Sequence, residues 1–142
     1  MTSASAIADG FLANIGAASV LGPTNVSKNT YQILESAASA ACVVRWQNFT
    51  ARPEQFGPLD TRDTWQFQLR LYLRDTGDAV ALLNRTWTVP QKIIDSLRSD
   101  STVQGTCIQI TSIEATQPDD LIEAGGHTWL LIPIGCMVIA DW

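Results

Sequence analysis

The clearest pattern in the chain is a strict alternation of apolar and polar side chains between Trp65 and Arg74. Large apolar side chains occupy every second position from Trp65 to Leu73, and Gln, Arg and Tyr side chains fill the positions between them. A period of two places one set on each face of a β-strand. The pattern therefore predicts a strand in a sheet that packs on a core with one face and meets water with the other.

Two further segments are predicted to be strands because they are rich in β-branched and apolar residues, namely 42–49 and 106–115. Strict alternation in the first would place Phe49 on the face opposite Trp46. In the second it would place Ile113 on the face opposite Ile110. The sequence thus assigns each of these side chains to a face on the assumption of regular strands.

The last segment, His127–Ala140, is predicted to be a long apolar strand that follows a turn at Gly125-Gly126. Within it, Gly135 suggests a bulge or a bend. Pro133 suggests an edge position or a local irregularity, because proline has no N–H to donate to a neighbouring strand.

The chain opens with a segment typical of an amphipathic helix, approximately Ser5 to Val20, whose apolar side chains recur at helical spacing at Ile7, Phe11, Ile15 and Ala18. Ser3 or Ser5 can cap its start, and Gly22-Pro23 ends it. The next segment, 24–41, allows two interpretations. One is a short helix that begins at Asn29, and the other is a short strand at 31–34.

A second helical region is expected after the turn at residues 75–78, where Asp78 is well placed as an N-cap. Its apolar residues follow helical spacing at Val80, Leu83 and Trp87, and again after Pro90 at Ile93, Ile94 and Leu97. Proline suits the first turn of a helix, so the region is either two helices or one kinked helix.

The order of these elements is a helix, an undecided segment, two strands, one or two helices, and two strands. Such an order predicts a single α+β domain over residues 1–142, with a mainly antiparallel sheet and helices packed on one face. A length of 142 residues is close to the commonest domain size.

The composition of the chain limits the classes of function that are expected. Charged residues make up 16% of the chain, against about 25% in typical globular domains, and the net charge is −5 with no cluster of Lys or Arg. Sequence-specific or duplex DNA binding and docking on an anionic membrane both need clustered cations, so neither is expected. The apolar window 129–139 is too short to span a membrane as a helix, and the N-terminus lacks the features of a signal peptide.

Candidate catalytic chemistry is sparse. The single His127 and the three cysteines (Cys42, Cys107 and Cys136) match no nucleophile or zinc spacing. The acidic residues Asp119, Asp120 and Glu123 match no calcium-loop pattern. We therefore expect no enzyme activity, no cofactor and no metal. The alternative from another class is a small cytoplasmic enzyme or ligand-binding domain with a closed pocket that joins His127 and Cys136.

The composition favours protein contacts as the use of the surface, because interface cores are poor in charge and rich in aromatic residues. The connection from Thr50 to Thr64 is about fifteen residues long, and connections of that length are usually functional or mobile. It contributes the first four of our candidate interface residues, the wet face of the alternating strand contributes three, and the C-terminus contributes one. These residues are Arg52, Phe56, Leu59, Arg62, Arg70, Tyr72, Arg74 and Trp142.

The organisation of the chain resembles that of the tail terminator proteins of long-tailed bacteriophages. An amphipathic helix (Ile7 to Val20) precedes a strand, a long loop and the alternating segment TWQFQLRLYLRD (Thr64 to Asp75). A helical stretch then ends in IIDSLRSDSTVQGTCIQI (Ile93 to Ile110), and a long apolar strand closes the chain. Within Ile93 to Ile110, the residues that resemble the family's turn into its next strand are Asp100, Thr102, Val103 and Gly105. Together these features cover most of the sequence.

The resemblance implies an α+β subunit of the virion tail or neck, made in the host cytoplasm, that assembles with copies of itself into a hexameric ring. Such a ring caps the tail tube protein, ends tube growth and presents a face to the head-completion protein, while DNA passes through the central hole. A head-closure protein or another neck component is the alternative within the same class, because small α+β architectures occur there too.

Overall fold

A computed structural model describes residues 3–17, 21, 25–28, 39–50, 63–107, 109–117 and 121–140. Two helices and six strands lie in these ranges. In chain order they are α1 (Ala4–Gly16), β1 (Val26–Ser27), β2 (Ala40–Thr50), β3 (Asp63–Arg74), α3 (Ala79–Ser99), β4 (Gln109–Ala115), β5 (Leu121–Ala124) and β6 (His127–Ala140).

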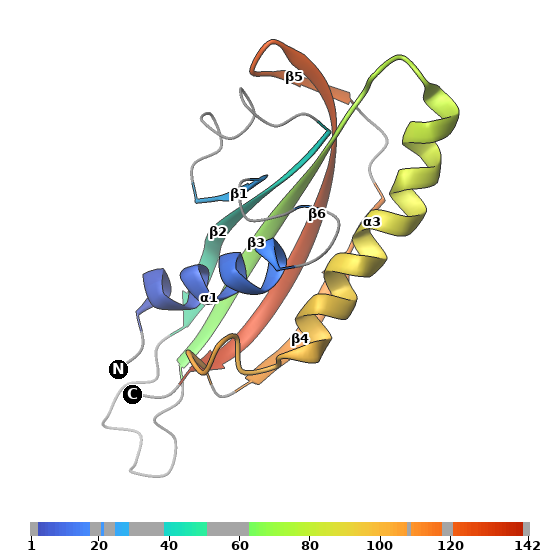
Figure 1. Cartoon of the computed structure of the whole chain (residues 1–142). Coiled ribbons are helices and arrows are strands. Elements are labelled where there is room, and N and C mark those ends of the chain that lie inside the picture. The colour runs from blue at the N-terminus through green and yellow to red at the C-terminus, as the bar shows by residue number, and fades with distance from the viewer. Residues whose placement is uncertain are drawn as a thin grey trace, which may run out of the picture.

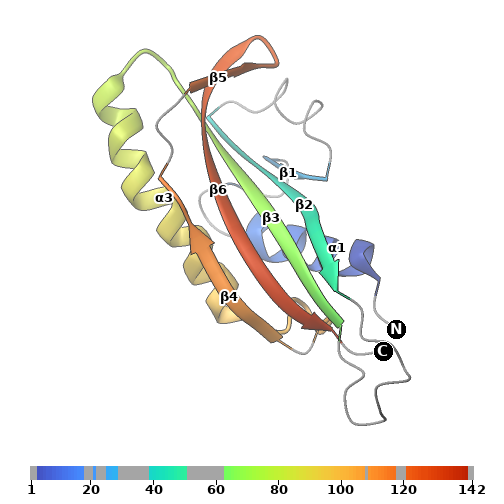
Figure 2. The ribbon, with the colours of Figure 1, turned by 180° about the vertical axis from the view of Figure 1, so that it is seen from behind.

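The strands form one sheet in the order β1-β2-β3-β6-β4, and β5 pairs with β6 as well. The short β1 runs parallel to β2, and all other pairs are antiparallel. Both helices lie on the same face of the sheet (Figure 1). The view from behind shows that the other face carries neither of them (Figure 2). The predicted α+β fold with a mainly antiparallel sheet and helices on one face is confirmed.

The main core lies between the two helices and this face of the sheet. From the helices it receives the buried side chains of Ile7, Phe11, Ile15, Val89, Ile93 and Leu97. The alternating positions of β3 meet them, and the rings of Phe11 and Phe67 lie 5.4 Å apart. Each fully buried side chain of this kind contributes roughly 1.5–3 kcal/mol, so the alternating pattern in β3 holds both helices against the sheet.

α1 begins one residue earlier than the sequence suggested, because the hydroxyl of Ser3 accepts a hydrogen bond from the backbone N–H of Ala6 at 3.1 Å. The helix ends at Gly16. Of the undecided segment 24–41, residues 29–38 lie outside the described ranges, so the choice between a helix from Asn29 and a strand at 31–34 stays open.

α3 is one continuous helix that contains Pro90, which decides between the two interpretations of this region. Its N-cap is Asp78, as predicted, and the carboxylate accepts a hydrogen bond from the backbone N–H of Ala81 at 3.1 Å. Proline removes the N–H that would bond the carbonyl four residues before it. Pro90 itself is buried, so its ring adds apolar contact where it removes a helical hydrogen bond.

β6 has the predicted bounds and pairs with β3 over twelve consecutive positions without a shift in register. Of the bulge or bend that Gly135 suggested, the bulge is therefore contradicted. Pro133 lies where β6 changes its outer partner from β5 to β4, and its carbonyl accepts a hydrogen bond from the N–H of Thr116 at 3.3 Å. The N–H and C=O of one strand residue point to the same side, so the N–H that proline lacks would face this gap between two partners.

Bulges occur instead in β2, between Trp46 and Asn48, and in β4, between Ile110 and Ser112. An extra residue reverses the faces that follow it. Phe49 consequently pairs with Trp65 and lies on the helix-bearing face, and Ile113 packs on the same core as Ile110. Both assignments made by strict alternation are wrong for this reason.

The polar face of β3 is also less exposed to solvent than predicted. Tyr72 is only 2% exposed and belongs to a second buried cluster with Ala41, Val43 and Trp129. Its ring meets that of Trp129 edge-on, with centroids 6.4 Å apart. β5 was not predicted as a strand from the sequence. Its side chain Ile122 packs on this cluster. This end of the sheet therefore buries apolar side chains on both faces.

Candidate protein-interaction surfaces

The N-terminal half of α3 carries an apolar stripe that faces solvent. Val80, Leu83 and Trp87 are 68%, 56% and 74% exposed. A different set of apolar residues, Leu82, Val89, Ile93 and Leu97, faces the core. At 100° per residue the two sets point in directions that differ by about 120°. We call Val80, Leu83 and Trp87 the α3 stripe.

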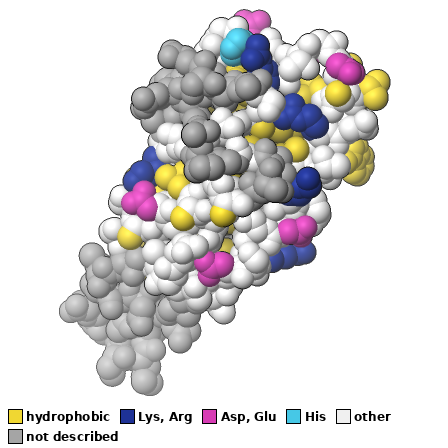
Figure 3. Space-filling view, viewed as in Figure 1, with side chains coloured by type: hydrophobic (Ala, Val, Ile, Leu, Met, Phe, Trp, Pro, Cys, Tyr) yellow, Lys and Arg dark blue, Asp and Glu magenta, His cyan; other side chains and the backbone are white. Residues whose placement is uncertain are grey.

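The helical spacing of these three residues is visible in the sequence, but the spacing alone did not predict that they form a surface. The signal was present, because the helix contains more apolar residues than one core-facing stripe can use. A typical surface helix has one apolar stripe and a polar opposite face. Figure 3 shows hydrophobic side chains at the outer edge of the molecule beside this half of α3.

A second apolar surface lies where β2 ends and β3 begins. Trp46 is 61% exposed and Phe49 is 36% exposed. Phe49 stacks on the ring of Trp65 with centroids 4.0 Å apart, and Trp46 meets the same ring edge-on at 6.2 Å. The bulge in β2 creates this cluster, since without it Phe49 would point to the other face. No local pattern in the sequence marks the bulge.

Trp46 also forms one side of an open groove with a volume of about 690 Å³ between β2 and the start of α1. The groove has an apolar floor and a polar rim. Its floor includes Ala4, Ala8, Val44 and Phe67, and its rim includes Ser5, Lys28, Arg45 and Gln47. We call this groove, together with Trp46 and Phe49, the β2 groove.

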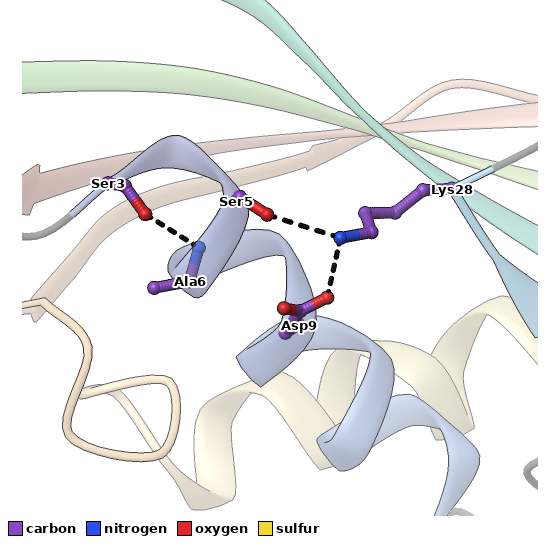
Figure 4. A network of polar contacts seen from close by, with 5 residues as sticks. All are labelled: Ser3, Ser5, Ala6, Asp9 and Lys28. Carbon is purple, nitrogen blue, oxygen red and sulfur yellow. Dashed lines mark hydrogen bonds and ion pairs between the residues drawn. The ribbon is translucent and has the colours of Figure 1, made fainter.

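One rim of the β2 groove is fixed by Lys28, which follows β1. Its ammonium group lies 2.7 Å from the carboxylate of Asp9 and 3.3 Å from the hydroxyl of Ser5, both on α1 (Figure 4). The pair is solvent-exposed, and such pairs contribute at most about 1 kcal/mol to stability. The pair neutralises this rim of the groove, because Asp9 balances the positive charge of Lys28. Arg45 is exposed as well, but its position in β2 pairs with Gln68 on the helix-free face.

The α3 stripe and the β2 groove lie on opposite sides of the molecule. α1 covers β1 and β2 at one edge of the sheet, whereas α3 lies beside β6 and β4 at the other edge (Figures 1 and 2). Trp87 itself borders a hollow shared with Ala115 and Thr116 at the end of β4. One copy of the chain therefore cannot place its own stripe in its own groove.

The candidate interface residues named from the sequence do not belong to the α3 stripe or to the β2 groove. Arg70 and Arg74 are half-buried on the helix-free face, and Arg70 donates a hydrogen bond from Nε to the side-chain oxygen of Gln68 at 2.9 Å. Tyr72, which lies between them in the sequence, is buried and is not accessible to a partner in this structure. The remaining candidates lie outside the described residues, namely Arg52, Phe56, Leu59, Arg62 and Trp142.

The geometry does not join His127 to Cys136. Both are on β6, nine positions apart, which is about 30 Å along a strand. An odd separation also places them on opposite faces. Burial raises the pKa of the Cys136 thiol to about 12, so it holds its proton at neutral pH. A closed pocket between these two side chains, as the alternative hypothesis requires, is thus contradicted.

Metal-ligating side chains do not cluster within the part of the chain that the structure describes. No group of three or more His, Cys, Asp or Glu side chains there could hold a metal ion. Glu123 lies in β5, and the neighbouring Asp119 and Asp120 fall outside the described ranges. No described helix is long and apolar enough to cross a membrane.

Comparisons with protein-family models and with curated protein sequences found no match to this chain.

Proposed function

We propose that this protein is a structural subunit of a bacteriophage virion that acts as the tail terminator. In this role, copies of the chain form a ring that caps the tail tube, ends its growth and provides a face for the head-completion protein. The resemblance in sequence organisation motivates the proposal. The observation that supports it best is the pair of apolar surfaces at opposite edges of one sheet.

Rings require this kind of arrangement. A closed ring is built from heterologous contacts, in which one surface of each subunit meets a different surface of the next. The α3 stripe and the β2 groove provide two different surfaces, and both expose tryptophan, which is enriched among residues that dominate binding energy. The net charge of −5 also suits a ring through which DNA passes without being held.

The test is to remove the protein from phage assembly and to image the products. We expect tails of uncontrolled length that carry no heads, and we expect purified protein added during tube growth to restore a defined length. Labelling the protein in intact particles should place it between tube and head. Tails of normal length in its absence would refute the terminator role, and a label on the head side of the joint would favour a head-closure protein.

A further inference from the structure

We propose that the α3 stripe of one copy occupies the β2 groove of the next copy, with Trp87 as the anchor. The inference rests on the proposed function, since it names the contact that would close the ring. Three observations lead to a second copy of this chain as the occupant of the groove.

The first observation is the match in chemistry between the two surfaces. The stripe presents three apolar side chains in a row along one helix, and the groove has an apolar floor bordered by Trp46. Its volume of about 690 Å³ lies in the range of roughly 300–1,000 Å³ that holds substantial ligands in proteins. An amphipathic helix that lays its apolar face in such a groove is a recurring mode of recognition.

The second observation is the charge beside the groove. Of the two basic residues beside the groove, Lys28 is paired with Asp9, and Arg45 occupies a position of β2 that pairs with Gln68 on the helix-free face. Among the described residues, the groove therefore offers its occupant apolar surface without an unbalanced charge. This suits an apolar stripe, because charged residues are depleted in the cores of interfaces.

The third observation is the position of the surfaces at the two edges of the sheet. β1 pairs only with Cys42 and Val43, so among the described strands the rest of β2 has an open outer edge. β4 pairs only with β6 in the same set and is open on its other side. Open edges favour pairing with further chains. A contact that joins opposite edges repeats in one direction, as a ring demands.

The experiment uses two variants of the full chain, Trp87→Ser for the stripe and Trp46→Ser for the groove. Association is measured by native mass spectrometry and light scattering at several protein concentrations. We expect wild-type protein to form closed rings, and each variant alone to associate at least about thirtyfold more weakly, as loss of an interface anchor typically does. Circular dichroism confirms that each variant is folded.

Mixing the two variants gives the decisive result. The Trp87→Ser chain retains an intact groove and the Trp46→Ser chain retains an intact stripe, so a mixture should form dimers of one chain of each kind and stop there. The matched controls are Lys92→Ser, exposed elsewhere on α3, and Met137→Ser, exposed on the helix-free face. Both should assemble like wild type. Phe49→Ser replaces Trp46→Ser if the latter does not fold.

Each contrary outcome overturns the contact. These outcomes are a wild-type protein that stays monomeric at every concentration, rings that form despite either tryptophan substitution, a mixture that contains only monomers, or loss of rings in Met137→Ser. Failure of the proposed function has a different signature. If rings depend on both tryptophans but do not limit tube length, the contact stands and the terminator role falls. If the tryptophan variants still form rings that cap tubes, the terminator role stands and the contact falls.

Discussion

The backbone carbonyl oxygen of Val103 lies 2.5 Å from the position that a Cβ atom on Gly10 would occupy. Gly10 is buried in the middle of α1, and Val103 is fully buried in the connection between α3 and β4. The contact thus joins the first helix directly to a turn about ninety residues later in the sequence. Only a residue without a side chain permits this approach of two backbones.

Gly10→Ala should lower the stability of the protein by about 1–3 kcal/mol, because the added methyl group must displace a backbone carbonyl. The sign is informative. In a helix without this contact the same change would raise stability by roughly 0.5–1 kcal/mol. Urea unfolding measures the difference, with Ala13→Ser on the exposed side of α1 as a control that should change stability by less than about 0.5 kcal/mol. A stabilised Gly10→Ala protein would contradict the contact.

The same turn is held by a polar network around Asp100. Three consecutive residues, Val103, Gln104 and Gly105, have positive φ angles of 50°, 60° and 73°, which are costly for the first two. The Asp100 carboxylate accepts hydrogen bonds from the backbone N–H groups of Thr102 and Gln104, and from the side chain of Asn14 on α1. These bonds stabilise a turn that its own residues disfavour.

Asp100 should make the protein sensitive to acid. The hydrogen bond from the backbone of Gln104, followed by those from the side chains of Thr102 and Asn14, lowers its pKa in the folded state. Its contribution to stability is therefore complete above the pKa of an unfolded Asp, about 3.9, and is lost as the pH falls further through the lowered folded pKa. In Asp100→Asn the decline in unfolding midpoint below pH 4 should be shallower than in wild type. The exposed Asp95→Asn substitution serves as the charge control, and an identical decline in wild type and Asp100→Asn would refute this role.

The two buried cysteines, Cys42 and Cys136, should react with thiol reagents only after unfolding. Burial, with a smaller effect from Cys136, raises the pKa of Cys42 to about 12, and burial raises that of Cys136 to about 12. The thiolate is the reactive form. At pH 8 we expect native protein to leave both unmodified over a time in which urea-unfolded protein is fully modified, as mass spectrometry would show. Cys107, with a pKa raised to about 11 mainly by burial, should react first. Rapid native labelling of Cys42 would contradict the predicted core.

Phe56→Ala tests the long connection between β2 and β3. If this connection makes protein contacts, the substitution should leave the thermal midpoint of the monomer unchanged and weaken assembly by about 2 kcal/mol or more, the usual cost of truncating an interface anchor. Thermal unfolding and native mass spectrometry measure the two effects separately. An equal loss of thermal stability would place Phe56 in the core instead.

How far a feature of this fold can be predicted from the sequence depends on the range of the interactions that fix it. The bounds of β6, the cap at Asp78, the turn before β6 and the core-facing positions of β3 are all set by neighbours within a few residues, and each was predicted. The faces of Phe49 and Ile113 were not, because bulges depend on how one strand fits its partner. The candidate surfaces suffered most, since exposure is a property of the whole packing and not of a local pattern.

Periodicity, capping residues and turn formers are local signals, and so the amino-acid sequence by itself determined that this chain forms a mainly antiparallel sheet with helices on one face. Only the tertiary structure decided that α3 has apolar residues left over after the core is filled, that a bulge turns Phe49 towards Trp65, and that Tyr72 is buried. The physical reason is that a core has a fixed amount of space, and which apolar side chains fill it depends on residues far apart in the sequence meeting in one register.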